Sequence, residues 1–179
     1  PADSGTQTVQ ATNKIRLLEN KKDFVNNKKQ QIRTKIFQLR QTLPYSEVYT
    51  KSQKILNQIL QLPEFSKAKT VFTYVSFGKE VKTRKLISEI FKQDKICLVP
   101  KINRDRDFLE IYQIKQWLDL GRGYKGILEP RNFCLQITDY KIIDLAFIPL
   151  VACDKQNNRL GYGKGYFDKL LKDFPPETP

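Results

Sequence analysis

The stretch IIDLAFIPLVACDKQNNRLGYGKGYFDKLLKDF occupies residues 142–174 and joins an apolar run to a glycine-rich loop and a helical pattern. Residues 142–152 are almost entirely apolar, which predicts a central strand of a sheet covered on both faces. Residues 165–174 have the apolar spacing of a helix. The order of strand, glycine-rich loop and helix predicts a site where backbone N–H groups and the helix dipole meet an anion.

The loop itself, NRLGYGKGYFD at residues 158–168, has three glycines at every second position. Glycine lets the backbone take positive φ and approach a ligand without a Cβ clash. Arg159 and Lys164 add positive charge, and Asp168 adds a carboxylate that can hold Mg²⁺ against phosphates. The spacing matches neither the Walker A motif nor the dinucleotide fingerprint. The pattern therefore favours phosphate binding, with a surface turn that carries incidental charges as the alternative.

The rest of the chain alternates between strand and helix patterns. Apolar and β-branched runs predict strands over residues 70–76, 95–100 and 107–114. Apolar spacing predicts helices from Lys28 to Pro44, from an N-cap at Ser46 to about Leu62, over 83–93 and over 114–120. This alternation predicts an α/β sheet that binds ligands beyond the carboxyl ends of its strands. GRGYKG at residues 121–126 matches G-x-G-x-x-G but follows a helical pattern, so a plain loop is predicted there.

The composition limits the chemistry that the chain can perform. The chain has 179 residues, a net charge of +13 and no histidine. The absence of histidine excludes Ser-His-Asp triads, Cys-His dyads and HExxH metal sites. The positive charge attracts anions such as nucleotides, polyglutamates, RNA or an acidic membrane, without choosing among them. No apolar run approaches the roughly 20 residues that span a bilayer, and the three cysteines have no zinc-site spacing.

These pieces occur in the order seen in the 5-formyltetrahydrofolate cyclo-ligase (methenyltetrahydrofolate synthetase) family, which the chain resembles. The segments that carry the resemblance are KKQQIR (28–33), YVSFGKEVKTRKLI (74–87), GILEP (126–130), DLAFIPLVACD (144–154) and NRLGYGKGYFDKLL (158–171). The resemblance implies an α/β fold, a single-domain three-layer sandwich with a mixed, mainly parallel sheet. It also implies that the domain, over 28–179, is C-terminally incomplete. The polar residues 1–27 predict a flexible extension in front of it.

The resemblance further implies a reaction. ATP and Mg²⁺ drive the conversion of 5-formyltetrahydrofolate, also in polyglutamylated form, to 5,10-methenyltetrahydrofolate. The γ-phosphoryl group of ATP passes to the formyl oxygen, N10 of the folate closes the ring, and phosphate leaves. Phosphoryl transfer needs positioning and charge neutralisation, which Lys, Arg and backbone N–H groups supply without an imidazole.

By the same resemblance, each candidate site residue has an implied role. Lys164 and Arg159 are the implied catalytic residues, and Asp168 is the implied metal ligand. The implied ATP-binding residues are Lys29, Arg33, Arg159, Leu160, Gly161, Tyr162, Gly163, Lys164, Gly165, Tyr166 and Phe167. The implied folate-binding residues are Val75, Glu80, Tyr162 and Tyr166. Without the resemblance, Lys29 and Arg33 are typical of a solvated helix end and Glu80 of an ordinary loop carboxylate.

Two other functions are kept as alternatives. The first is a catalytically impaired cyclo-ligase-like domain that serves as a structural or RNA-associated subunit of a larger, mitochondrial assembly. The net charge of +13, the polar N-terminal residues and the end of the sequence at Pro179 motivate it. The second is a generic small-molecule kinase. The expected location is the cytoplasm or the mitochondrial matrix.

Overall fold

A five-stranded mixed sheet forms the centre of the computed structural model, which describes residues 4–123 and 126–179, with side chains from residue 21 onwards except residue 22. The strand order is β6-β3-β2-β1-β7. The strands are β1 (Thr70–Thr73), β2 (Ile96–Asn103), β3 (Phe108–Ile114), β6 (Gln136–Ile137) and β7 (Leu145–Phe147). β1 runs parallel to β2 and β7, whereas β3 runs antiparallel to β2 and β6. The mixed α/β sheet is confirmed, with a larger antiparallel share than expected.

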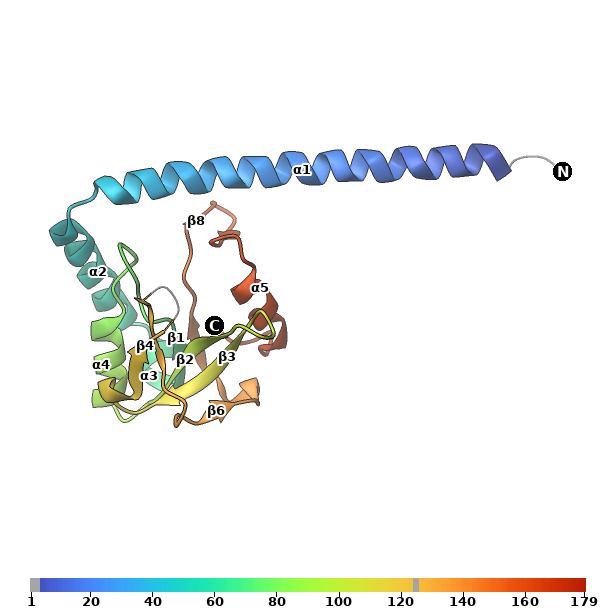
Figure 1. Cartoon of the computed structure of the whole chain (residues 1–179). Helices are drawn as coiled ribbons and strands as arrows, with labels where there is room; N and C mark the ends of the chain where they lie inside the picture. The colour runs from blue at the N-terminus through green and yellow to red at the C-terminus, as the bar shows by residue number, and fades with distance from the viewer. Residues whose placement is uncertain (1–3, 124–125) are drawn as a thin grey trace.

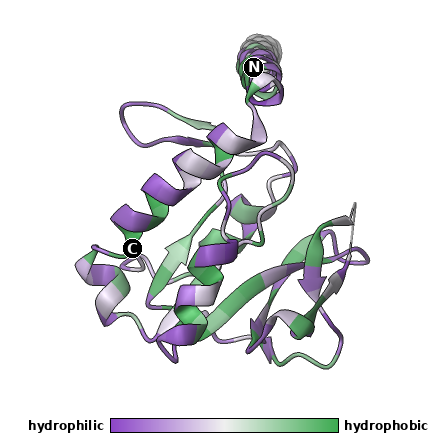
Figure 2. Cartoon of the chain, turned by 90° about the vertical axis from the view of Figure 1, so that its left-hand side faces the viewer, coloured by the Kyte–Doolittle hydropathy of each residue, from purple (hydrophilic) through white to green (hydrophobic). Residues whose placement is uncertain are grey.

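Helices cover both faces of the sheet and complete the predicted three layers (Figure 1). α2 (Tyr45–Ile59), α3 (Pro63–Lys67) and α4 (Arg84–Lys92) contribute apolar side chains to the core on one face. α5 (Tyr166–Leu170) and the 3-10 turn Leu171–Asp173 cover the other face. In Figure 2 the central strands are mostly hydrophobic, whereas the helices contain both hydrophilic and hydrophobic residues.

The two cores follow from the alternation of side chains along the buried strands. In β2, Cys97 and Val99 belong to the core under α2 and α4, whereas Leu98 belongs to the core under α5. Since both faces are covered, β1 and the middle of β2 consist of buried residues, as the apolar runs at 70–76 and 95–100 predict, although the strand predicted over 70–76 ends at Thr73. The predicted strand 107–114 and helix 83–93 are also confirmed, as β3 and α4.

α1 extends much further toward the N-terminus than predicted. It spans Ser4–Thr42, although the sequence favoured a flexible extension up to residue 27 and a helix only from Lys28. Residues 6–43 contain neither glycine nor proline, so no residue in this segment breaks the helix. Figure 1 shows α1 as a long rod whose C-terminal part passes over the β8 region. Residues 1–3 lie outside the described residues, and the division into an extension and a domain stays a prediction.

The segment predicted as a central strand, 142–152, is instead mostly loop at the edge of the sheet. After the 3-10 turn Tyr140–Ile142, β7 is the one described strand of this segment that joins the five-stranded sheet, and it pairs there with β1. Pro149 lacks the N–H that would extend a ladder, so the chain leaves the sheet. It then forms a two-stranded hairpin, β8 (Ala152–Cys153) with β9 (Arg159–Leu160), which leads into the glycine loop.

Three smaller predictions also need correction. The N-cap of α2 is Pro44 rather than Ser46. The predicted helix 114–120 is a 3-10 turn, Trp117–Asp119, because the Asp119 carboxylate accepts hydrogen bonds from two preceding backbone N–H groups. GRGYKG falls in a hairpin between β4 (Leu120–Arg122) and β5 (Leu128–Pro130), so part of the predicted loop is strand. Residues 124–125 of this segment lie outside the described residues.

None of the described helices combines the length and the apolar character needed to cross a lipid bilayer.

Candidate active site

A cavity of about 370 Å³ lies beyond the carboxyl ends of β1 and β2, where the α/β pattern predicts a ligand site. The segment that follows β1, the outer ends of β2 and β3, and the glycine loop form its walls. Ten of the predicted site residues line it: Val75, Glu80, Arg159, Gly161, Tyr162, Lys164, Gly165, Tyr166, Phe167 and Asp168. The structure therefore brings together two groups of candidates, one before α4 and one in the glycine loop and the first turn of α5.

Aromatic and aliphatic side chains make up much of the wall opposite the glycine loop. The apolar residues that sequence analysis did not select are Tyr74, Phe77, Pro100, Ile102, Leu109, Ile127 and Pro149. Their pattern in the sequence is that of ordinary core residues, so no local signal marks them as part of a site. Together they give the cavity a surface suited to a flat, largely apolar ring system.

The glycine loop has the backbone conformation that its glycines predict. Gly163 and Gly165 have φ values of +104° and +70°, in the left-handed region that favours glycine. Gly165 is the N-cap of α5. A Cβ built at Gly163 would lie 3.5 Å from the Arg33 guanidinium carbon, so α1 approaches the loop closely. The expected helix after the loop is short, because α5 spans five residues before the 3-10 turn.

Two charged candidates at the loop pair with each other. The Arg159 guanidinium donates to the Asp168 carboxylate, and both side chains line the cavity. Lys164 also lines the cavity and is exposed. Among the described residues, no cluster of three or more His, Cys, Asp or Glu side chains has a metal-binding arrangement. Asp168, the carboxylate that the sequence predicts as a metal ligand, lines the cavity together with the carboxylates of Glu80 and Glu129.

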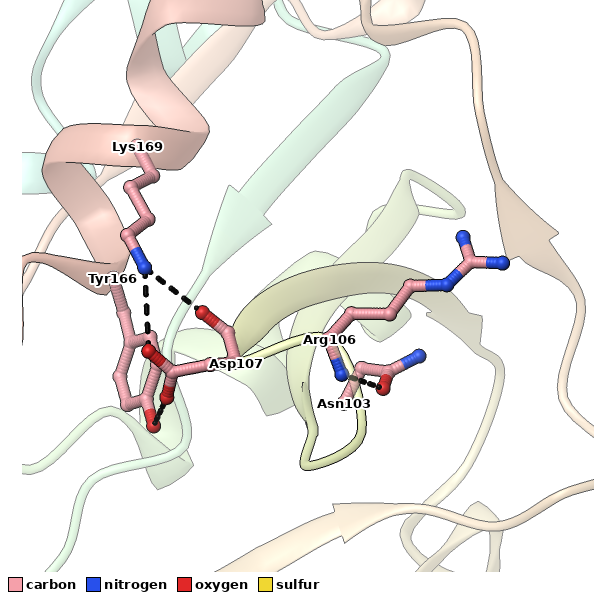
Figure 3. Close-up of polar contacts among 5 residues, drawn as sticks. All are labelled: Asn103, Arg106, Asp107, Tyr166 and Lys169. Atoms are coloured by element: carbon pink, nitrogen blue, oxygen red, sulfur yellow. Dashed lines mark hydrogen bonds and ion pairs between the residues drawn. The ribbon is translucent and has the colours of Figure 1, made fainter.

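Polar contacts fix the start of α5 on the turn before β3 (Figure 3). The Tyr166 hydroxyl donates to Asp107 at 2.8 Å, and the Lys169 ammonium lies 3.0 Å from the Asp107 carbonyl oxygen. Hydrogen bonds from Tyr166 and Lys169 lower the pKa of Asp107. The same turn is closed by the Arg106 N–H, which donates to the Asn103 side chain at 3.0 Å. Tyr166 is thereby held at the edge of the cavity.

Glu80 meets the glycine loop through Tyr162. The Tyr162 hydroxyl donates to one Glu80 oxygen, and the other oxygen accepts from the Phe77 N–H at 2.8 Å. Burial and the Glu80 carboxylate raise the pKa of Tyr162, so its hydroxyl stays protonated as a donor. This contact joins the predicted folate-binding glutamate to the predicted ATP loop.

α1 supports the loop from outside the cavity. Arg33 donates to the Gly161 carbonyl oxygen at 2.8 Å, which places this predicted ATP-binding residue at the loop. Lys29 is exposed one turn away and forms no hydrogen bond with the described residues. Phe37 and Arg40, which sequence analysis missed, contact Tyr162. The signal that marks them is their position on the helical face that carries Lys29 and Arg33.

An apolar cavity at the carboxyl ends of parallel strands, closed by a cationic glycine loop, is typical of an α/β protein that binds a ring compound next to an anionic group. Residues 25–178 match the model of the 5-formyltetrahydrofolate cyclo-ligase family. The chain belongs to this family, whose name and relatives indicate a ligase.

Named relatives agree with this assignment. The chain is 31% identical to the 5-formyltetrahydrofolate cyclo-ligase of Haemophilus influenzae over 82% of its own length and 79% of the relative's. An NMR structure of Aquifex aeolicus 5,10-methenyltetrahydrofolate synthetase superposes with a TM-score of 0.72 at 33% identity, covering 82% of this chain and 73% of that one. The Mycoplasma pneumoniae 5,10-methenyltetrahydrofolate synthetase gives a TM-score of 0.64 at 27% identity, covering 84% and 81%. These relatives support a folate cyclo-ligase reaction.

Proposed function

We propose that the chain converts 5-formyltetrahydrofolate to 5,10-methenyltetrahydrofolate with ATP and Mg²⁺, and that polyglutamylated folates are also substrates. The observation that carries the proposal is the single cavity that combines an apolar wall with the glycine loop and its cations. The wall suits a pterin ring, and the loop suits a triphosphate. The names of the relatives support the folate as one of the two ligands.

On the folate side, Val75 and the aromatic rings contact the flat ring system. Glu80 accepts hydrogen bonds from ring N–H groups, since it lies at the cavity wall and is already oriented by the Phe77 N–H. Tyr162 and Tyr166 border the same space from the glycine loop. A cavity of about 370 Å³ lies within the roughly 300–1,000 Å³ range of small-molecule sites.

On the nucleotide side, the loop from Arg159 to Phe167 surrounds the phosphates. The glycines present backbone N–H groups without Cβ atoms in the way. Lys164 neutralises charge on the transferred phosphoryl group, and Arg159 holds its neighbouring oxygens. Lys29 and Arg33, one helical turn apart on α1, reach the phosphates from the outer side.

The reaction needs these groups for position and charge rather than for proton relay. The formyl oxygen attacks the γ-phosphorus, and the bond from that phosphorus to the ADP oxygen breaks. N10 of the folate then attacks the formyl carbon and gives up its proton to the departing phosphate or to solvent, and the C–O bond breaks as phosphate leaves. Lys164 and Arg159 stabilise the negative charge that moves during both steps. The apolar wall holds N10 near the carbon and excludes water.

Mg²⁺ binds through one or two carboxylates and the phosphates of its substrate, so a single aspartate at the loop fits this ion. Asp168 is exposed and supplies that carboxylate when it exchanges its contact with Arg159. The ion, when bound, would offset phosphate charge. We expect Asp168→Asn to raise the Mg²⁺ concentration for half-maximal rate about tenfold or more. A rate assay at varied Mg²⁺ and saturating ATP measures this, and an unchanged Mg²⁺ requirement would contradict the role.

The growth of the methenyl-folate absorbance band tests the proposal directly. The full chain, mixed with 5-formyltetrahydrofolate, is expected to produce the band only when both ATP and Mg²⁺ are present. A folded protein without turnover would contradict the proposal and favour the structural or RNA-associated role, which stays a prediction. ADP release without methenyl formation would instead indicate a small-molecule kinase. The cytoplasmic or mitochondrial location also stays a prediction.

A further inference from the structure

Four side chains share the face of α1 that contacts the glycine loop. Lys29, Arg33, Phe37 and Arg40 are spaced i, i+4, i+8 and i+11, so they fall within an arc of about 80° around the helix. The first two are the proposed nucleotide contacts. The other two lie toward the C-terminal end of the helix, where it passes Tyr162.

Phe37 and Arg40 together hold Tyr162 against Glu80. The rings of Phe37 and Tyr162 are 5.7 Å apart between centroids, and one Arg40 nitrogen lies 3.4 Å from the Tyr162 hydroxyl oxygen. The other terminal nitrogen of Arg40 donates to the carbonyl oxygens of Leu150 and Val151 at 2.8 and 3.1 Å. Arg40 is therefore anchored to the segment after β7 while it contacts Tyr162.

The position of Tyr162 depends on these contacts because its two neighbours are glycines, which restrict the backbone least. Arg33 holds the preceding residue through the Gly161 carbonyl oxygen at 2.8 Å. A triphosphate bound to the loop amides and to Arg33 would order the same backbone. With the backbone on both sides fixed, the contacts of Phe37 and Arg40 would hold the Tyr162 side chain in one position next to Glu80.

We propose that Phe37 and Arg40 are positioning residues that couple nucleotide binding at α1 and the glycine loop to folate binding at Glu80. This inference rests on the proposed function, because it assigns the two ligands to the two sides of Tyr162. When one ligand orders Tyr162, the second ligand binds a loop that is already ordered. Each ligand therefore raises the affinity of the chain for the other.

Calorimetry on the full chain tests the coupling, with 5-formyltetrahydrofolate titrated in the presence and absence of a saturating non-hydrolysable ATP analogue and Mg²⁺. For the unmodified chain, the analogue is expected to lower the folate Kd about fivefold or more. In Phe37→Ala and in Arg40→Gln, the two folate Kd values should agree within about twofold. The affinity of the analogue alone should stay the same, because neither residue is a nucleotide contact.

Two controls separate this role from general effects of charge and stability. Lys35→Gln removes the same charge as Arg40→Gln from an exposed position on the opposite side of α1, and it should keep the full coupling. Tyr162→Phe keeps the ring next to Phe37 but removes the hydroxyl, and it should lose the coupling while the thermal unfolding midpoint stays close to that of the unmodified chain. This second variant tests the link even where Phe37→Ala unfolds.

The results distinguish the inference from the proposed function. If the unmodified chain turns over and shows coupling, and if the Phe37, Arg40 and Tyr162 variants retain it, the positioning role is wrong and the function stands. If the unmodified chain binds neither ligand, both are wrong. Loss of coupling in these variants, with coupling retained in Lys35→Gln, would establish the role.

Discussion

The parallel half of the sheet and the glycine loop are held in place in different ways. Val71, Phe72 and Leu98 are fully buried and belong to the parallel ladder between β1 and β2. The loop around Tyr162 and Lys164 is exposed, and side chains from distant segments such as α1 fix its position. Stability should therefore reside in the sheet, whereas ligand affinity should depend on a few polar and aromatic contacts. Substitutions in the two regions should separate these two properties.

Phe72→Ala should have the largest effect, on stability. Phe72 has no exposed surface, and its ring packs edge-on against Phe174 with centroids 5.5 Å apart. Removing a buried ring from a closed core costs about 3–5 kcal/mol in the free energy of unfolding. Urea denaturation followed by circular dichroism measures the change. Phe133→Ala, at a position with 73% exposure, is the matched control and should change stability by about 0.5 kcal/mol or less. Equal changes in the free energy of unfolding for the two variants would contradict the view that stability resides in the buried sheet.

Lys164→Ala should show the opposite behaviour, with a large effect on turnover and a small one on folding. Its ammonium group lines the cavity but is exposed, so the fold does not depend on it. Loss of a charge that stabilises phosphoryl transfer should lower kcat/KM for ATP by about 10²–10³. Steady-state kinetics of methenyl-folate formation measure this, and Lys172→Ala, exposed just beyond α5, is the control. If Lys164→Ala also lowered the free energy of unfolding substantially, the glycine loop would contribute to stability as well as to turnover.

Glu80→Ala should affect one ligand and spare the other. Glu80 lines the cavity next to Tyr162, and we propose that it binds the folate; its loss should then weaken 5-formyltetrahydrofolate binding about tenfold to a hundredfold, as expected for a hydrogen bond to a charged group. Nucleotide binding measured without folate should stay nearly unchanged. Separate titrations of the two ligands check this, with Glu64→Ala on α3 as an exposed control. An equal loss for both ligands would count against the role given to Glu80.

The sequence predicts the sheet region better than the site because the sheet depends on local patterns. Runs of apolar and β-branched residues identify β1, β2 and β3, and apolar spacing identifies α4. The same reasoning misplaces 142–152, since an apolar run indicates burial but not the position of a strand in the sheet. In that run only Leu145–Phe147 pairs with β1, and Ile148 and Leu150 beyond it line a second cavity next to α2 instead of extending the ladder.

For the site, the glycine loop is predictable and its supports are not. Alternating glycines and adjacent charges are visible in one short segment, and the positive φ values of Gly163 and Gly165 agree with them. Arg40, in contrast, donates to carbonyl groups 110 and 111 residues away, and Tyr162 donates to Glu80, 82 residues away. No pattern within a short window contains such pairs. Phe37 and Arg40 could be found only as neighbours of Lys29 and Arg33 on the same helical face.

The smallest expected effect concerns Cys97, whose ionisation reports how well the core of the sheet excludes water. Burial raises the pKa of its thiol from 9.0 to about 12, whereas the thiol of the unfolded chain ionises near the lower value. Below about pH 8 the thiol is neutral in both states, so stability does not depend on its ionisation. Between pH 8 and pH 10 the unfolded chain loses the proton and the folded chain keeps it, so the free energy of unfolding should fall by about 1 kcal/mol.

Cys97→Ala should lack this part of the pH dependence in denaturation experiments under reducing conditions, whereas Cys153→Ala, at an exposed position, should keep it. If Cys97→Ala kept the full pH dependence, solvent would have to reach the core beneath α4 about as readily as it reaches the glycine loop.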